Sequence, residues 1–236
     1  TSGFVKIWDV ITENKLLTLS DFTGDVTSVA FNQDGTRLAT VDLGGNAIIW
    51  DIATGKNLST FSIGDKQCYF NALFNQDSTR LITSDSCGVI RFWDITGNFG
   101  QELFHRNVRS SGGSVSLNLS PNGTQLAVGE NNSISIWDAS TGFDLFVLPS
   151  DSQAWGTDFS SDGNLFAAGG YGSTVIKVWE LSPHGEKNTL IVEDSSQIGS
   201  TPYVSDEYGD VTFSPDGKQL VIVNRKGDKI YTWDTT

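Results

Sequence analysis

Residues 31–51 read FNQDGTRLATVDLGGNAIIWD and contain both signals that decide the fold. The Asp-Gly pair at 34–35 lies between two apolar runs, which is a strong hairpin signal because Gly and Asn tolerate positive φ at a tight turn. The segment ends on an apolar-Trp-acid tripeptide at 49–51. We expect four short strands around these signals, over 26–31, 37–41, 46–50 and 57–61.

Both signals recur along the chain at a regular spacing. The Trp of the tripeptide lies at positions 8, 50, 93, 137, 179 and 233, so successive intervals are 42, 43, 44, 42 and 54 residues. The turn signal recurs in the segments 74–83, 119–128, 159–168 and 213–222. About four short strands per period, Gly-rich turns and no helical periodicity predict an all-β radial repeat. We expect the Trp residues to pack between neighbouring sheets.

On these tripeptides and turns, the sequence resembles the WD-repeat β-propeller family over essentially its whole length. The resemblance implies blades of four antiparallel strands, labelled a to d from the inside outward, with strand c ending on the Trp-acid pair. It also implies that the d–a and b–c connections share one face, which is the usual partner-binding face in the family.

The resemblance assigns structural roles to the Trp-acid pairs: Trp8, Trp50, Trp93, Trp137, Trp179 and Trp233, and Asp9, Asp51, Asp94, Asp138 and Asp234. Two family features are missing. No unit carries the His that precedes strand a. The position six residues before each Trp, where the family has Asp, holds Gly44, Cys87, Asn131, Ser173 and Gly227. We therefore expect packing and tight turns, rather than a buried His–Asp network, to stabilise the blades.

We interpret residues 1–236 as one WD-repeat β-propeller domain with five full repeats after an N-terminal partial blade. The partial blade covers about 1–20, and the repeat units are approximately 21–62, 63–105, 106–148, 149–193 and 194–236. Family members most often have seven blades, so we expect a part of a seven-bladed or larger propeller within a longer polypeptide or complex. A self-contained five-bladed ring is the alternative.

The charge balance limits the partners. The net charge is −13, from 15 basic and 28 acidic residues, and such a surface repels phosphate backbones. We therefore expect no nucleic-acid partner. We expect no membrane partner either, because no run approaches 18 consecutive apolar residues. A protein or peptide with basic residues fits this surface, and the compartment is left open with a slight preference for the cytoplasm.

The long interval before Trp233 contains about a dozen extra residues. Since 188–193 is predicted to be a strand d, the excess falls at 195–210, in a d–a connection. We select Tyr203, Asp206, Glu207 and Tyr208 there as candidate partner contacts, because Tyr offers a large contact area and carboxylates suit Lys or Arg. A solvated insertion without a ligand is the alternative.

Trp155 is the fifth candidate contact, because it is the only Trp outside the repeat pattern. It lies at the start of a predicted strand a, where sister units have Thr27, Phe70, Val115 and Gly209. Strand a lines the central channel in the family, so the resemblance places Trp155 at the channel mouth. Additional packing is the alternative.

Metal-ligand and nucleophile patterns are weak. His105 and His184 have no His or Cys neighbours at ligand spacing, so we expect no metal, no cofactor and no catalytic residue. We interpret Cys68 and Cys87 as two isolated thiols. The alternative, a disulfide, stays open because both residues are expected near one face.

Together these features favour a non-catalytic scaffold or sensor module that binds a protein or peptide on the face formed by the d–a and b–c connections. The alternative is a propeller with small-ligand or enzymatic activity in its central channel.

Overall fold

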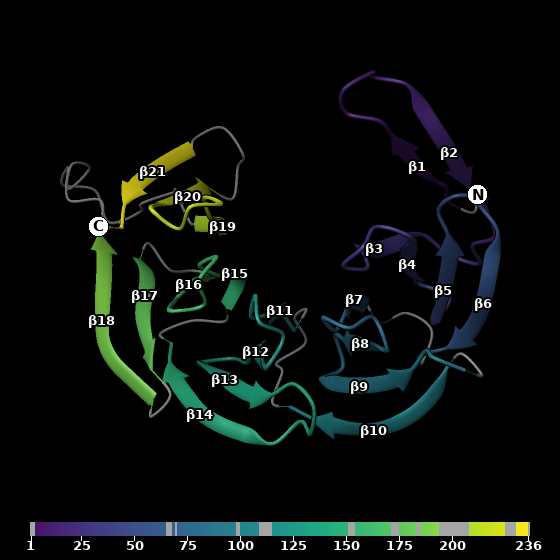
Figure 1. The fold of residues 1–236 in the computed structure, drawn as a ribbon. Helices are drawn as coiled ribbons and strands as arrows, with labels where there is room; N and C mark the ends of the chain where they lie inside the picture. The colour runs from purple at the N-terminus through teal and green to yellow at the C-terminus, as the bar shows by residue number, and fades with distance from the viewer. Residues whose placement is uncertain are drawn as a thin grey trace. The chain divides into compact units, whose positions relative to one another are not determined.

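The computed structural model is all-β in every part that it describes. It describes residues 3–64, 68, 70–97, 100–108, 115–150, 154–170, 175–182, 185–193, 208–224 and 230–235. Within these ranges the regular elements are the antiparallel strands β1 to β21 (Figure 1). None of the described segments is a helix with the length and apolar character needed to cross a membrane.

The chain forms two compact units, residues 1–115 and 116–236. The first unit contains a two-stranded sheet, β1-β2, followed by two four-stranded sheets, β3-β4-β5-β6 and β7-β8-β9-β10. Their strands are β1 (Val5–Trp8), β2 (Lys15–Leu19), β3 (Val26–Phe31), β4 (Arg37–Asp42), β5 (Asn46–Asp51), β6 (Asn57–Ser62), β7 (Phe70–Phe74), β8 (Arg80–Asp85), β9 (Val89–Asp94) and β10 (Gln101–Asn107).

The second unit contains two four-stranded sheets, β11-β12-β13-β14 and β15-β16-β17-β18, and the three-stranded sheet β19-β20-β21. Their strands are β11 (Leu117–Leu119), β12 (Gln125–Gly129), β13 (Ser133–Asp138), β14 (Asp144–Pro149), β15 (Ala154–Phe159), β16 (Leu165–Gly170), β17 (Val175–Ser182), β18 (Gly185–Glu193), β19 (Tyr208–Phe213), β20 (Gln219–Asn224) and β21 (Ile230–Asp234).

The strands predicted around the first Asp-Gly turn are confirmed, with β4, β5 and β6 each extending one residue further than expected. Gly35 adopts φ 71° and its amide donates to the carbonyl of Asn32 at 3.1 Å. The Asp34 carboxylate accepts from the amide of Thr36 at 2.9 Å. A residue with a side chain disfavours this φ, so the glycine and the carboxylate together fix the hairpin between β3 and β4. At the equivalent position of the next sheet, Ser78 adopts φ 58°.

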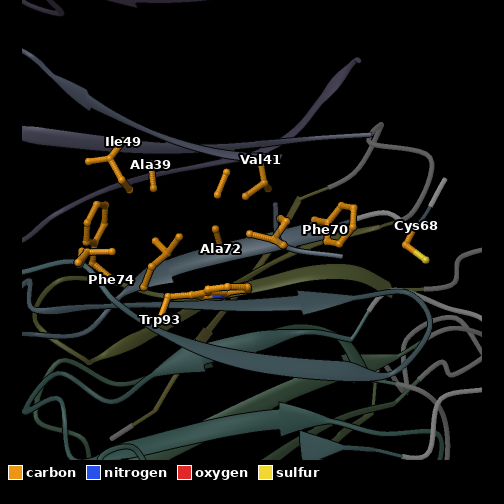
Figure 2. Packing of buried hydrophobic residues seen from close by; sticks show 12 residues of the cluster. Ala39, Val41, Ile49, Cys68, Phe70, Ala72, Phe74 and Trp93 are labelled. Carbon is orange, nitrogen blue, oxygen red and sulfur yellow. The ribbon is translucent and has the colours of Figure 1, made fainter. Parts of the chain in front are cut away.

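A core layer fills the space between the sheets β3–β6 and β7–β10 (Figure 2). Trp93 is 4% exposed and belongs to the same core cluster as Ala39 and Ile49 of the preceding sheet. Its ring centroid is 5.2 Å from that of Phe61, on the outer strand of the preceding sheet. Small aliphatic side chains on one sheet therefore make room for the large ring of the next.

The same arrangement recurs between the other sheets within each unit. Trp50 packs with β1 and β2, Trp179 with β13, and Trp233 with β16 and β17. Trp50 and Trp179 are buried, whereas Trp233 is half-buried. Trp8 is 53% exposed, and within the first unit its strand β1 pairs only with β2.

Candidate partner-binding face

The b–c and d–a connections lie at the same end of each sheet and are joined by backbone hydrogen bonds. The amide of Ile63, just after β6, donates to the carbonyl of Gly45 in the β4–β5 turn at 2.8 Å. The amide of Val108, just after β10, donates to Gly88 in the β8–β9 turn at 2.8 Å. The bond from Ser150 to Asn132 repeats this in the second unit. We name this end of the blades the loop face.

Asp42 fixes the loop face of the first four-stranded sheet. It ends β4 and is 1% exposed. One carboxylate oxygen accepts from the amide of Thr23 at 2.9 Å and from its hydroxyl at 3.2 Å. The other accepts from the amide of Asn46 at 3.1 Å and from its side-chain nitrogen at 3.3 Å. Four donors compensate the desolvation of this buried carboxylate.

Asp85 has the same position in the next sheet and different partners. It is 3% exposed, and one oxygen accepts from the amides of Cys87 at 3.0 Å and Val89 at 2.9 Å. The other oxygen accepts from Arg91 Nη1 at 2.8 Å. Arg91 Nε lies 3.8 Å from Glu102 Oε2. Asp85, Arg91 and Glu102 therefore form two successive ion pairs that extend from the turn to the outer strand β10.

The expectation that packing and tight turns alone stabilise the blades is incomplete for the first unit, which has buried carboxylates in place of a His–Asp network. The buried network of the first unit contains no His, and its acids do not lie six residues before the Trp. Asp42 and Asp85 instead lie eight residues before Trp50 and Trp93, respectively. Each of these indoles donates through Nε1 to a Thr of the preceding strand at 2.9 Å, Thr40 and Thr83 respectively. A buried carboxylate and a Trp–Thr hydrogen bond therefore stabilise both blades.

The Trp–Thr bond does not recur in every sheet. In register with Thr40 and Thr83, the second unit has Val128, Ala168 and Ile222, which cannot accept a hydrogen bond from their side chains. Accordingly, buried Trp179 Nε1 has no hydrogen-bond partner in the described structure. The second unit thus relies more on packing, which the sequence predicts for the whole chain.

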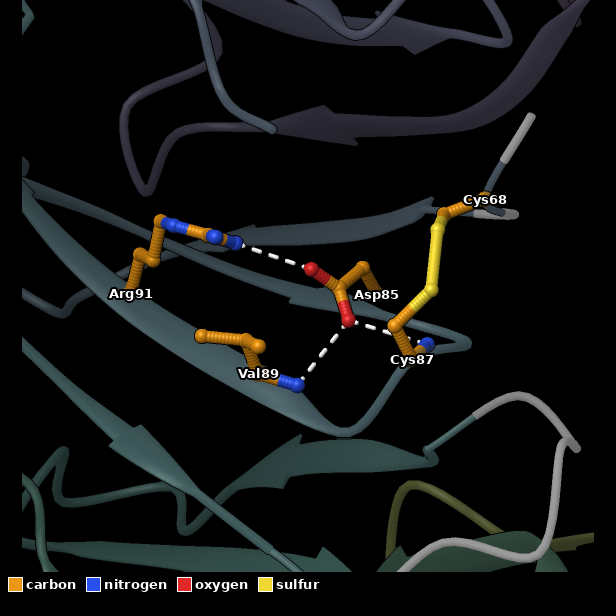
Figure 3. The surroundings of a disulfide bond; sticks show 5 residues. All are labelled: Cys68, Asp85, Cys87, Val89 and Arg91. Atoms are coloured by element: carbon orange, nitrogen blue, oxygen red, sulfur yellow. Dashed lines mark hydrogen bonds and ion pairs between the residues drawn. A yellow bond between two sulfur atoms is a disulfide. The ribbon is translucent and has the colours of Figure 1, made fainter. Parts of the chain in front are cut away.

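Cys68 and Cys87 form a disulfide across the loop face (Figure 3). The preferred interpretation of two isolated thiols is therefore wrong, and the disulfide alternative is confirmed. The bond joins residues 19 apart in sequence, with a Cα–Cα distance of 6.4 Å. It links the connection before β7 to the β8–β9 turn, because both approach the same end of one sheet.

The opposite end of the blades is built from turns closed by carboxylates. The acids of the Trp-acid pairs cap the c–d turns: Asp51 accepts from the hydroxyl of Thr54 at 2.6 Å and from its amide at 2.8 Å. These bonds hold the pKa of the Asp51 carboxyl below its ordinary value of 3.8. Side-chain and backbone hydrogen bonds of the same kind lower the pKa of Asp9, Asp94 and Asp138, and of the hairpin acids Asp34, Asp77, Asp162 and Asp216. Asp234 is exposed at the end of β21.

These lowered pKa values predict a loss of stability in acid. A carboxyl whose pKa is lower in the folded state stabilises the fold above its unfolded pKa, and this contribution is lost as the pH falls through the folded pKa. We expect the urea midpoint to fall steeply between about pH 4 and about pH 2. Asp51→Asn should flatten part of this slope, and Thr54→Val should act in the same direction. Parallel pH profiles for wild type and Asp51→Asn would contradict this prediction.

Polar side chains also connect the inner strands of neighbouring sheets in the second unit. Asp158 on β15 accepts from the amide of Phe213 at 2.8 Å and from the Thr212 hydroxyl at 3.0 Å, both on β19. Asn118 on β11 donates to the carbonyl of Thr157 at 2.7 Å. These bonds cannot be predicted from the sequence, because single polar residues within short apolar strands carry no spacing signal.

The structure places two of the five candidate contacts at the beginnings of adjacent inner strands. Trp155 is the second residue of β15, and it is the extra residue of a bulge where Ala154 pairs with Gly170 and Gly156 with Gly169. Tyr208 is the first residue of β19 and pairs with Asn224. Tyr208 therefore begins a strand and does not lie in the connection where it was expected. Tyr203, Asp206 and Glu207 lie outside the described residues.

Gly156 allows β15 and β19 to approach closely beside Trp155 and Tyr208. A Cβ at Gly156 would lie 2.7 Å from the Cα of Asp210 and 2.8 Å from the amide nitrogen of Val211. These are backbone atoms, which cannot rotate away. The close approach therefore requires glycine at this position.

Gly156→Ala is expected to lower the free energy of unfolding by about 2 kcal/mol, because the strands must separate to admit the methyl group. Urea unfolding followed by circular dichroism measures the effect. Gly97→Ala is the control, since a Cβ there would meet nothing within 4 Å. Equal stability of the two variants would show that the strands do not approach as described.

The described residues contain no group of three or more His, Cys, Asp or Glu side chains arranged to hold a metal ion. Their carboxylates instead close turns, accept from backbone amides or pair with Arg91. In the described structure, these carboxylates therefore have a structural role in supporting the turns.

Repeated four-stranded antiparallel sheets, stacked through Trp and small aliphatic residues within each unit, are the blades of a β-propeller. A chain in the solved structure described as "Crystal Structure of Mitotic Checkpoint Complex" has this fold, with a TM-score of 0.81 over 99% of the present chain and 69% of that chain, at 18% identity. Residues 13–51 and 104–138 match the family model "WD domain, G-beta repeat". These two matches support a WD-repeat family for the chain.

Two curated proteins are similar to shorter parts of the chain. Retinoblastoma-binding-like protein E of Dictyostelium discoideum is 33% identical over 61 residues, which are 26% of this chain and 12% of that protein. Pre-mRNA-processing factor 19 of Oryza sativa subsp. japonica is 34% identical over 73 residues, which are 31% of this chain and 14% of that protein. The matched part is thus a small fraction of each relative.

Proposed function

We propose that this chain is a non-catalytic protein-interaction scaffold whose protein or peptide partner binds at the loop face. The observation that carries the proposal is the fixed position of the loop-face turns. Buried Asp42 and Asp85 hold the β4–β5 and β8–β9 turns, and backbone bonds join these turns to the following connections. A surface that is ordered before binding loses less conformational entropy on association.

The comparisons support this class of function. One relative is named as a retinoblastoma-binding-like protein, and the solved structure with the same fold is a protein complex. These names describe the other two proteins. From the shared repeats, we propose a binding role for the present chain.

We propose that the partner contacts the beginnings of β15 and β19 and the connection that leads into β19. Trp155 and Tyr208 begin these adjacent strands, and Tyr203, Asp206 and Glu207 precede Tyr208 in sequence. Aromatic residues provide most of the binding energy at many protein interfaces. With a net charge of −13, the chain is suited to a segment that carries Lys or Arg, and not to nucleic acid.

The proposal predicts which peptides bind and where. Selection from a random displayed peptide library should enrich Lys- and Arg-containing sequences. The double variant Tyr203→Ala/Tyr208→Ala should weaken the binding of a selected peptide by at least about tenfold in fluorescence anisotropy, because two aromatic anchors are removed. Its thermal midpoint should stay close to that of the wild type.

The matched control is Gln33→Ala/Gln76→Ala, which alters two exposed hairpin residues at the opposite end of the blades. This control should bind the peptide with wild-type affinity. If the tyrosine variant binds as tightly as the control, the residues before β19 are not the contact surface and the proposal fails at this site.

A further inference from the structure

The two residues of the Cys68–Cys87 disulfide differ in accessibility. Cys68 is 7% exposed and belongs to the core cluster that also contains Phe70 and Trp93. Cys87 is exposed in the β8–β9 turn (Figure 3). A disulfide is opened by a thiolate that reaches one of its two sulfur atoms. The exposed residue of this pair is therefore the one that an external thiol can approach.

The two ends of the bond are also held differently. The turn of Cys87 keeps several hydrogen bonds that do not depend on the disulfide: the Cys87 and Val89 amides donate to Asp85, and the Gly88 amide donates to the Asp85 carbonyl at 3.1 Å. In addition, Asp85 is paired with Arg91. Cys68 is held by apolar packing and by the disulfide itself. Opening the bond therefore removes the covalent tie of Cys68 and leaves the turn of Cys87 supported.

We propose that Cys87 is a site of thiol–disulfide exchange with a dithiol reductant, and that the exchange releases Cys68 from its covalent tie to the β8–β9 turn while that turn stays in place. The release is bounded on both sides. On the N-terminal side of Cys68, the Ile63 amide donates to the Gly45 carbonyl, and on its C-terminal side, Phe70 is 1% exposed in the core. The tie between Cys68 and the β8–β9 turn of the loop face thus depends on redox state, and any effect of this change on partner binding rests on the function proposed above.

The exchange balances as a two-electron reduction. A thiolate of the reductant attacks Cys87 Sγ, a mixed disulfide forms there, and the Sγ–Sγ bond breaks with its electron pair on Cys68 Sγ, which takes up a proton. The second thiolate of the reductant then attacks the reductant sulfur of the mixed disulfide and releases Cys87, which also takes up a proton. The protein gains two thiols, and the dithiol is oxidised to its own disulfide.

The site of attack can be located by trapping the first step with a monothiol. The folded protein is incubated with reduced glutathione, quenched in acid, denatured, alkylated and digested for mass spectrometry. We expect the glutathione adduct on Cys87 and the alkyl group on Cys68. An adduct mainly on Cys68, or reaction only after denaturant is added, would overturn the proposal.

The structural consequence has an independent readout. After reduction with dithiothreitol, amide hydrogen exchange should become faster at Gly64 and Cys68 and stay unchanged at Val89, and the thermal midpoint should fall by roughly 5 to 10 °C. The variant Cys68→Ala/Cys87→Ala should show the same exchange pattern without reductant. Faster exchange at Val89, or no change at Cys68, would contradict the release. No partner is used in either experiment, so their failure would leave the proposed binding function standing.

Discussion

Replacing Trp93 by alanine is expected to lower the free energy of unfolding by about 4 kcal/mol, the largest effect that we predict for a single substitution. The side chain is 4% exposed and fills the layer between two four-stranded sheets. Its removal leaves a cavity against Ala39 and Ile49, and it leaves the buried hydroxyl of Thr83 without its indole donor. Urea unfolding followed by circular dichroism measures the loss.

Trp8→Ala is the matched control, because Trp8 occupies the same repeat position but is 53% exposed. It should cost roughly 1 kcal/mol or less. Trp93→Phe separates the two parts of the effect, since it keeps a ring in the layer but loses the bond to Thr83. Equal losses for the alanine variants of Trp93 and Trp8 would show that the repeat Trp does not act by packing between sheets.

Replacing Asp42 by alanine is expected to lower the free energy of unfolding by about 3 kcal/mol, because the donors of Thr23 and Asn46 lose their buried acceptor. Asp42→Asn should cost nearly as much, since an amide nitrogen in place of one oxygen faces donors on that side. The amides of Thr23 and Asn46 should exchange faster with deuterium in both variants, which locates the damage at the loop face.

Asp21→Ala serves as the control for charge, because Asp21 is exposed and lies shortly before Thr23, one of the donors to Asp42. It should leave both the unfolding free energy and the two amide exchange rates close to those of the wild type. A stability loss for Asp21→Ala that matches the loss for Asp42→Ala would mean that net charge, and not the four hydrogen bonds, is responsible.

The strands could be predicted closely because two local signals act at every repeat. Apolar runs set the strands, and the turn signal between them, which is Asp-Gly at 34–35 but Asp-Ser at 77–78 and Asn-Gly at 122–123, sets their ends. The expected strand at 26–31 is β3, and the expected 188–193 lies within β18. The start of β19 was misplaced because its first residues, Tyr208 to Asp210, are polar or Gly. They join the sheet by pairing with β20, which is a tertiary effect.

The buried carboxylates Asp42 and Asp85 were not predicted, because the family pattern places the acid six residues before the Trp. The carboxylates lie eight residues before the Trp, at the ends of RLATVD (37–42) and RLITSD (80–85), and an acid that closes two equivalent apolar strands was the available signal. The disulfide had a weaker signal. Whether Cys68 and Cys87 meet depends on how one sheet brings a connection and a turn together, and spacing along the chain does not encode that.

The most direct test of the proposed binding role is site-specific photo-cross-linking to a peptide selected on the wild-type chain. A photoreactive phenylalanine analogue is placed at Tyr208, at the start of β19, or at Gln33, in the hairpin at the opposite end of the blades. We expect a cross-linked peptide from position 208 and none from position 33. Cross-linking from position 33 alone would contradict the proposed binding role.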